Sequence, residues 1–216
     1  MAILKKDLYI FMMVLFCIIT VAYIYKIKPL FVFSTFLFIS LVCLLCIMNT
    51  KERYTQPELR DILTKVVEKF NQYDIKYWVD YGSLLGIIRE NDIIKHDNDT
   101  DICIFPDNPD IEQKLVKIVK ELGHPYYLEY NSWSVDTFRI RKRAGMFIFD
   151  PYTDIYGTKK EGNMFVDATG KIPIELIGKT QKISWNGVSV TVPEKIHETL
   201  VWRYGENYKT PMLFKR

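Results

Sequence analysis

Residues 77–105 read YWVDYGSLLGIIRENDIIKHDNDTDICIF, and this stretch decides the fold. Its pattern of apolar and turn residues predicts, in order, a strand over 77–81, a turn at Gly82-Ser83, a short helix over 84–89 and a strand over 101–105. Carboxylates occupy alternate positions where the second strand begins: Asp97, Asp99 and Asp101. We therefore expect a group of acidic side chains at one end of a sheet.

The rest of the chain predicts a mixed α/β core. Apolar residues recur at helical spacing over 57–70 and 109–122, so each segment is expected to form a helix with one buried face. Further expected elements are strands over 126–130, 135–140, 146–155 and 164–166, a hairpin of strands 182–185 and 188–192 that turns at Asn186-Gly187, and a helix over 193–204. Roughly 160 residues are enough for one such core.

The N-terminal part has a different composition. Residues 8–25 and 30–48 carry no charged side chain, and each would be about 27 Å or more in length as a helix, close to the roughly 30 Å of a bilayer's hydrocarbon. Only four residues separate the two runs. We therefore expect a two-helix transmembrane hairpin in a membrane anchor over 1–50, followed by a catalytic domain over 51–216, with the lipid bilayer as a partner.

Basic residues flanking the two runs predict how an integral membrane protein would be oriented. Lys5 and Lys6, together with Lys51, Arg53 and Arg60, outnumber the two lysines between the runs, which favours a cytoplasmic catalytic domain. The domain would be lumenal if only one segment spans. A cleaved signal peptide is the alternative for the first run, and a buried pair of core helices is the alternative for both.

Charge and cysteine usage exclude several classes of protein. Residues 1–50 hold four of the 29 basic and one of the 26 acidic residues, so the remainder is balanced at 25 of each sign. A balanced domain lacks the broad cationic face that nucleic-acid binding requires, and we expect no nucleic-acid partner. The four cysteines lie in apolar surroundings, which argues against a disulfide framework.

The alternating acids predict a metal site. On an extended backbone alternate side chains share one face, so Asp99 and Asp101 point together and Asp97 lies near the start of the strand. Paired hard carboxylates suit Mg²⁺ or Mn²⁺. A calcium-binding EF-hand loop is excluded, because its sixth position would be Ile102 instead of glycine and its twelfth would be Asn108 instead of glutamate. A solvated acidic turn remains the alternative.

The turn before these acids strengthens the metal interpretation. At a strand-to-helix turn, Gly82 lets the backbone approach a ligand, and the Ser83 hydroxyl with the first helical N–H groups suits a phosphate. A glycine-serine turn followed by Asp-x-Asp at the start of an apolar strand is the pattern of the nucleotidyltransferase-like fold, in which a neighbouring strand supplies a third carboxylate. Asp150 and Asp154 are both candidates for that ligand.

Two motifs resemble those of the LicD family, which includes fukutin and fukutin-related protein. The first is residues 77–102, with a Gly-Ser-Leu-Leu-Gly turn, an arginine and the Asp-x-Asp-x-Asp loop. The second is Gly187 to Pro193 with the later Tyr204-Gly205 and Tyr208. The resemblance covers about residues 60–211. It departs from the family at Lys95-His96, where Pro-Trp is usual, and the family's third acid has a context that favours Asp154.

This resemblance implies an α/β (α+β) fold with a nucleotidyltransferase-like mixed sheet and flanking helices. It also implies transfer of a phosphorylated alcohol, such as phosphocholine or ribitol or glycerol phosphate, from a CDP-linked donor to a glycan hydroxyl. The metal ligands expected on this basis are Asp99, Asp101 and Asp154, holding Mg²⁺ or Mn²⁺. Gly82 and Ser83 would bind the phosphates of the leaving nucleotide.

Several roles remain open at this point. Arg89 is expected either to clamp a phosphate or to pair with Glu90 or Asp92. Either Asp97 or Asp154 is expected to take the proton of the acceptor hydroxyl. His96 is expected to be either a base or an orienting hydrogen-bond donor. The alternative functions are transfer of a nucleoside monophosphate and a catalytically inactive, membrane-tethered binding module with the same fold.

Overall fold

The structure is a computed structural model that describes residues 19–21, 23, 25, 35–40, 42, 56–130, 136–143 and 150–211. The chain divides into two compact units, Met1–Arg53 and Tyr54–Arg216. The second unit, called the α/β domain below, carries every element that positions the candidate site.

The prediction of an integral membrane protein is contradicted. Within the part of the chain that the structure describes, no helix is both long enough and apolar enough to pass through a bilayer. Most of the predicted hairpin, 8–25 and 30–48, lies outside the described residues.

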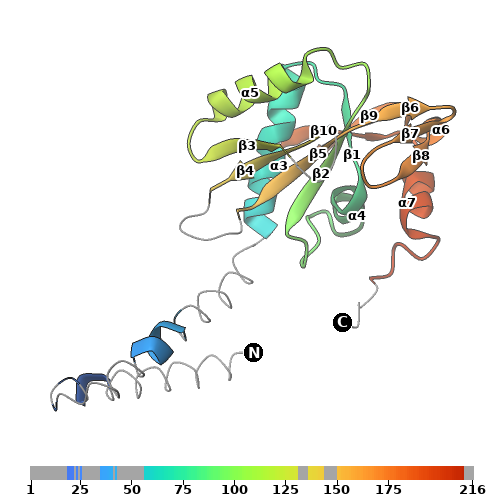
Figure 1. The fold of residues 1–216 in the computed structure, drawn as a ribbon. Helices are drawn as coiled ribbons and strands as arrows, with labels where there is room; N and C mark the ends of the chain where they lie inside the picture. The colour runs from blue at the N-terminus through green and yellow to red at the C-terminus, as the bar shows by residue number, and fades with distance from the viewer. Residues whose placement is uncertain are drawn as a thin grey trace. The chain divides into compact units, whose positions relative to one another are not determined.

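A mixed five-stranded sheet forms the centre of the α/β domain, as the sequence predicted (Figure 1). Its strands lie in the order β1-β2-β5-β4-β3, and only the β2–β5 pair is parallel. The bounds of the strands are β1 Tyr77–Val79, β2 Asp99–Ile104, β3 Tyr126–Tyr130, β4 Thr137–Lys142 and β5 Tyr152–Gly157. Because β2 and β5 run the same way, their first residues meet at one edge of the sheet.

Helices and two smaller sheets surround this sheet (Figure 1). The long helices α3 (Gln56–Gln72) and α5 (Ile111–Leu122) end within two residues of their predicted bounds. The remaining elements are α4 Tyr81–Glu90, β6 Lys159–Glu161, β7 Met164–Val166, β8 Lys171–Pro173, α6 Ile174–Ile177, β9 Thr180–Trp185, β10 Val188–Pro193 and α7 Ile196–Tyr204. Strands β9 and β10 form the predicted hairpin at Asn186-Gly187, whereas β6–β7–β8 form a separate sheet.

Two apolar cores lie on opposite faces of the large sheet because successive strand residues point to opposite sides. On β1 and β2, Val79 and Ile102 belong to the larger core with helix α3, whereas Trp78 and Cys103 belong to the smaller core with the β6–β7–β8 sheet. All four of these side chains are fully buried. The acids of β2 share the face of Cys103, so they lie on the side opposite helix α3.

The start of helix α4 differs from the prediction. Strand β1 ends at Val79 and the helix begins at Tyr81, three residues early, because the fully buried Asp80 caps it: its carboxylate accepts a hydrogen bond from the Tyr81 N–H at 2.7 Å. Tyr81 has φ +49°, a left-handed conformation that non-glycine residues rarely adopt. Gly82 and Ser83 therefore lie in the first turn of the helix, next to the sheet.

Gly86 in helix α4 offers a test of this packing. A Cβ at residue 86 would lie 2.6 Å from the carbonyl oxygen of Asp92 and 3.0 Å from the amide nitrogen of Ile94. We expect Gly86→Ala to lower the free energy of unfolding by about 1–2 kcal/mol, because the backbone clash outweighs the roughly 1 kcal/mol gained in helix propensity. Urea denaturation measures it.

Gly170→Ala is the matched control, since a Cβ there meets only the Arg203 guanidinium, at 3.8 Å. Its free energy of unfolding should stay within about 0.5 kcal/mol of the wild type. Equal stabilities of the two variants would contradict the close packing of α4.

Candidate active site

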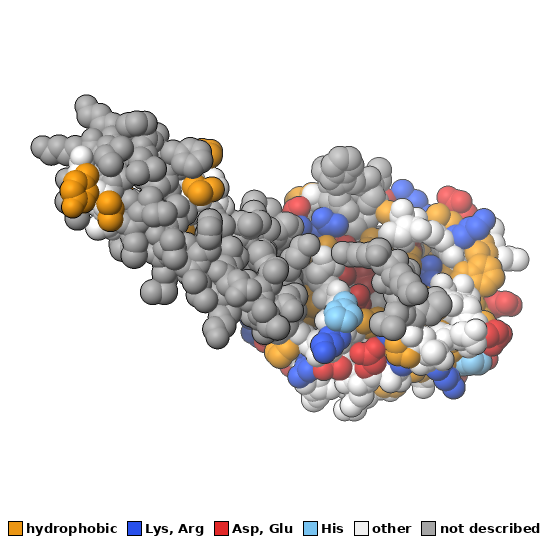
Figure 2. Space-filling model, turned by 90° about the horizontal axis from the view of Figure 1, so that it is seen from below, with side chains coloured by type: hydrophobic (Ala, Val, Ile, Leu, Met, Phe, Trp, Pro, Cys, Tyr) orange, Lys and Arg blue, Asp and Glu red, His pale blue; other side chains and the backbone are white. Residues whose placement is uncertain are grey.

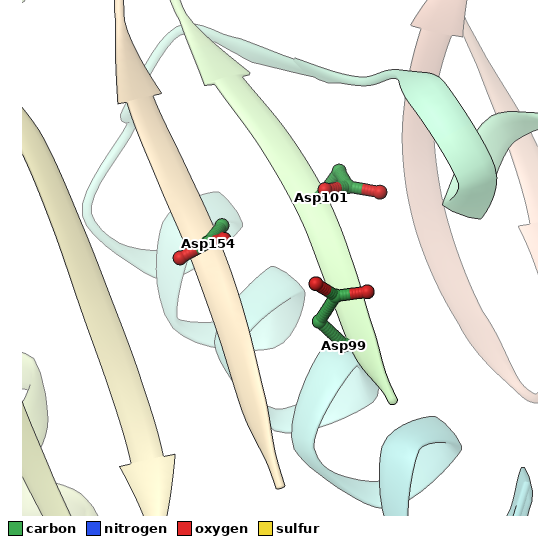
Figure 3. Close-up of side chains that lie close together, drawn as sticks. All are labelled: Asp99, Asp101 and Asp154. Carbon is green, nitrogen blue, oxygen red and sulfur yellow. The ribbon is translucent and has the colours of Figure 1, made fainter. Parts of the chain in front are cut away.

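Three carboxylates converge at the start of the parallel strand pair. Strand β2 contributes Asp99 and Asp101, and strand β5 contributes Asp154, which is paired in register with Asp101 (Figure 3). One ligand oxygen from each of the three lies within 4.8 Å of the others. The structure thus brings together the three side chains that the sequence and the resemblance selected. We call them the acid triplet.

The glycine-serine turn lies directly against this triplet. A Cβ at Gly82 would lie 2.8 Å from Asp97 Oδ2 and 3.6 Å from Asp101 Oδ2, so any larger residue would displace the Asp97 carboxylate. The buried Ser83 hydroxyl accepts a hydrogen bond from the Asp101 N–H at 2.7 Å. A contact of Ser83 with phosphate stays a prediction. In the structure, the Ser83 hydroxyl holds the backbone of Asp101 in place.

Asp97 lies beside the triplet and outside it. Its N–H donates to the Ile94 carbonyl at 3.0 Å, in the turn that leads into β2. Burial raises the pKa of Asp97 to about 6, and the charges of Asp99 and Glu90 add to the rise. This carboxyl is therefore poised close to neutral pH when no cation is bound.

Burial and mutual repulsion disfavour the charged forms of the triplet. Burial raises the pKa of Asp99, and the charge of Asp154 raises it further. The pKa of Asp101 lies well above its usual range, first through burial and then through Asp99, Asp154 and Asp97. A divalent cation would relieve both effects, since like carboxylates at this separation need a counter-charge. Figure 2 shows acidic side chains recessed in the described surface of the domain, with His, Lys and Arg side chains nearby.

Side chains of β4 and β5 that the sequence did not single out contact the triplet. Arg139, paired in register with Asp154, binds that carboxylate with Nε–Oδ1 2.5 Å. Tyr156 donates to Asp154 Oδ2 at 3.2 Å, and Tyr152 donates to Asp99 Oδ2 at 3.3 Å. Arg139 belongs to a basic run of the sequence, with Arg141, Lys142 and Arg143. Only the β4–β5 register, which no local motif encodes, reveals its partner.

Arg89 and His96 do not contact the triplet. Arg89 forms an ion pair with Glu90 at 2.6 Å, one of the two roles expected for it, and donates to the Tyr208 carbonyl at 3.3 Å. His96 is exposed, and its charge lowers the pKa of Asp97 only as a minor contribution after burial and the acidic neighbours. A phosphate contact of Arg89, and the role of His96 as a base or an orienting donor in substrate binding, stay predictions.

The two sequence motifs meet through a buried ion pair that the sequence did not predict. Arg203 of α7 binds Asp80, the cap of α4, at 2.6 Å, and the indole N–H of Trp78 donates to the same carboxylate at 2.9 Å. The Arg203 guanidinium also lies 4.1 Å from the centre of the Tyr81 ring. Helix α7 therefore holds the turn that places Gly82 against the acids.

The other candidate for the third ligand lies elsewhere. Asp150 accepts a hydrogen bond from the Tyr127 hydroxyl at 2.7 Å, and it is not among the three carboxylates that converge. This agrees with the choice of Asp154 over Asp150 from the resemblance.

The donor set of the triplet fits Mg²⁺ or Mn²⁺. These ions take carboxylate and water oxygens, and an octahedral ion with ligands at about 2.1 Å holds them roughly 3–4 Å apart. The triplet spans at most 4.8 Å, so only small side-chain movements are needed. The surrounding hydroxyls of Tyr152 and Tyr156 orient two of the carboxylates, as supporting hydrogen bonds commonly do at metal sites.

Neutralising one acid tests the electrostatics of the triplet. In metal-free protein, Asp101→Asn should raise the free energy of unfolding by about 1 kcal/mol or more, because repulsion and burial of charge are relieved. Added Mn²⁺ should raise the melting temperature of the wild type and leave that of the variant unchanged. Calorimetry with and without Mn²⁺ measures both effects.

Asp107→Asn is the control, since Asp107 forms an exposed ion pair with Lys76 away from the triplet. It should respond to Mn²⁺ like the wild type. A full Mn²⁺ response in the Asp101 variant would show that the ion binds elsewhere.

Comparison with known proteins supports the resemblance. A human protein, "Ribitol 5-phosphate transferase FKRP", is 30% identical over 125 residues, covering 48% of this chain and 25% of its own length. An uncharacterized protein of Rickettsia prowazekii is 30% identical over 96 residues, covering 42% of this chain and 36% of its own. The matches thus span between a quarter and just over a third of these relatives.

A solved structure, ANT(2")-Ia in complex with adenylyl-2"-tobramycin, aligns with a TM-score of 0.45 and 15% identity, covering 70% of this chain and 77% of that one. The profile of the family "LicD/FKTN/FKRP, nucleotidyltransferase domain" matches residues 74–195, which include β1, α4, the acid triplet and the β9–β10 hairpin. The chain belongs to the LicD/FKTN/FKRP family and carries its nucleotidyltransferase domain.

Proposed function

We propose that this protein is a divalent-metal-dependent transferase that moves a phosphorylated alcohol, of the phosphocholine or ribitol or glycerol phosphate type, from a CDP-linked donor to a glycan hydroxyl. The convergence of Asp99, Asp101 and Asp154 beside the glycine turn carries this proposal. Family membership supports a transferase of phosphorus-containing groups, and the name of the human relative supports a sugar-alcohol phosphate as the transferred group.

The triplet would hold Mg²⁺ or Mn²⁺, which when bound neutralises charge on a pyrophosphate undergoing in-line displacement. The chain's own residues have positioning roles. Ser83 holds the Asp101 backbone, and Gly82 lets the Asp97 and Asp101 carboxylates lie close to the first turn of α4. Tyr152 and Tyr156 fix the orientation of Asp99 and Asp154.

We infer that Asp97 is the general base that accepts the proton of the acceptor hydroxyl. Asp154 is 3% exposed and accepts hydrogen bonds from Arg139 and Tyr156, and in the proposed reaction it also holds the metal, which lowers its basicity. Asp97 is partly exposed and lies beside the triplet. Because Asp97 is not one of the three ligands, its carboxylate is left to accept a proton.

Transfer of a nucleoside monophosphate is the second candidate, because the matched family domain is described as a nucleotidyltransferase domain. The same metal site would serve both reactions, since each attacks one phosphorus of a donor pyrophosphate. The two differ in which half of the donor reaches the acceptor. The intact triplet argues against an inactive binding module.

Labelled donors test the proposal. CDP-ribitol, CDP-glycerol and CDP-choline, each labelled on both the cytidine and the alcohol, are incubated with the purified full chain, Mg²⁺ and glycan acceptors. We expect only the alcohol label in the glycan, and Asp99→Asn should lower the rate at least about 100-fold because charge stabilisation of the transferring group is lost. Asp107→Asn should keep the wild-type rate. Cytidine label in the product would establish nucleotidyl transfer instead, and undiminished transfer by Asp99→Asn would exclude metal catalysis at the triplet.

The variant Asp97→Asn tests whether Asp97 acts as the general base or as a metal ligand. We expect kcat to fall about 100-fold, since general-base catalysis commonly contributes 10²–10⁴, while Mn²⁺ affinity, measured by electron paramagnetic resonance, stays within about threefold of the wild type. Loss of Mn²⁺ binding comparable to that of Asp101→Asn would identify Asp97 as a metal ligand and remove it as the base.

A further inference from the structure

Arg139 forms an ion pair with Asp154, one of the three acids expected to hold the metal. It is paired in register with Asp154 on neighbouring strands, and its guanidinium binds both oxygens of that carboxylate, with Nε–Oδ1 2.5 Å and Nη2–Oδ2 3.4 Å. The side chains are 22% and 5% exposed, so solvent screens the pair only weakly. A cation of the protein therefore already neutralises one member of the triplet.

Arg139 and a metal ion would compete for the same carboxylate. The two oxygens of Asp154 offer about four lone pairs, of which Arg139 takes two and Tyr156 takes one. A divalent ion coordinated there would face the guanidinium at close range, and the two positive charges repel. We therefore expect metal binding to weaken the contact between Arg139 and Asp154.

Arg139 has a second anchor that keeps it at the site. Its Cζ lies 4.8 Å from the centre of the Tyr152 ring, and the Cζ of Arg141 lies 4.5 Å from the same centre. Tyr152 in turn donates to Asp99. After release from Asp154, Arg139 can remain over this ring by a cation–π contact, beside the metal and on the same face of the sheet.

We propose that Arg139 is a resident counter-cation of the acid triplet: a divalent ion displaces it from Asp154, and the freed guanidinium then binds a phosphate of the nucleotide donor. The first step concerns this chain and the metal alone. The second step rests on the proposed function. Guanidinium groups bind phosphate oxygens through paired, charge-assisted hydrogen bonds, which gives the freed Arg139 a suitable new partner.

Mn²⁺ binding to the purified full chain, without nucleotide, tests the displacement. Arg139→Gln should bind Mn²⁺ on the order of tenfold more tightly than the wild type, because the competing charge is gone. Arg141→Gln is the matched control: it removes the same charge two residues along β4, where the partner is Glu129 instead of a triplet acid, and the Mn²⁺ affinity should change less than about threefold. Unchanged or weaker Mn²⁺ binding by Arg139→Gln would overturn the proposal and make Arg139 a simple support of Asp154.

Arg139→Lys decides the question if the glutamine variant does not fold. Lysine keeps the charge but makes a single bond in place of the fork, so Mn²⁺ binding should tighten by about threefold. Binding equal to or weaker than that of the wild type would overturn the displacement. A melting curve of each variant shows whether it is folded, and Arg139→Lys is used if Arg139→Gln is not.

CDP binding at saturating Mg²⁺ tests the second step. Arg139→Gln should bind CDP about tenfold more weakly, opposite in sign to its effect on Mn²⁺, and Arg141→Gln should bind it within about threefold of the wild type. Equal CDP affinity in Arg139→Gln and the wild type would overturn the phosphate contact. If the wild type itself does not bind CDP, the proposed function and the phosphate contact fail together, while the Mn²⁺ measurement still decides the displacement.

Discussion

Parallel pairing of β2 with β5 is the constraint on which the site depends. It sets Asp101 opposite Asp154. Asp99 lies two residues before Asp101 on β2, so all three acids share the face of the sheet opposite α3. Three carboxylates within 4.8 Å on a partly buried face repel one another strongly, because screening there is weak. The neighbouring groups are arranged around that repulsion. Arg139 supplies a positive charge, and Tyr152 and Tyr156 donate hydrogen bonds to the acids.

The helix α4 turn is held against the acids by parts of the chain that are distant in sequence. Asp80 caps the helix and is bound by Arg203 from α7, more than 120 residues later. Burying a charge is costly unless it is paired, and Asp80 is paired with a guanidinium, an indole N–H and a backbone N–H. In this chain, Arg203, which supports the first motif, comes directly before Tyr204-Gly205 of the second.

Alternation along the strands divides the sheet into a structural face and a face that carries chemistry. On one side Ile102 and Ile155 pack in the core with α3. On the other side Cys103 and Tyr156 pack against the small β6–β7–β8 sheet. Asp101 and Asp154 lie two residues before them, on the same face. The apolar half of that face anchors the strands, so the acidic half is presented on a rigid support, as a site with exacting geometry requires.

Much of this arrangement follows from the sequence alone. The helical periodicity of α3 and α5, the Asn186-Gly187 hairpin and the Asp-x-Asp alternation are local patterns, and local backbone preferences determine them. The early start of α4 was not predictable, because it depends on burial of Asp80 against Arg203. The two uncharged runs predicted membrane spans, and the described part of the chain contradicts that prediction. The sequence context already favoured Asp154, but only the tertiary structure set it opposite Asp101 and paired it with Arg139, because strand register depends on how the whole core packs and no short motif records it.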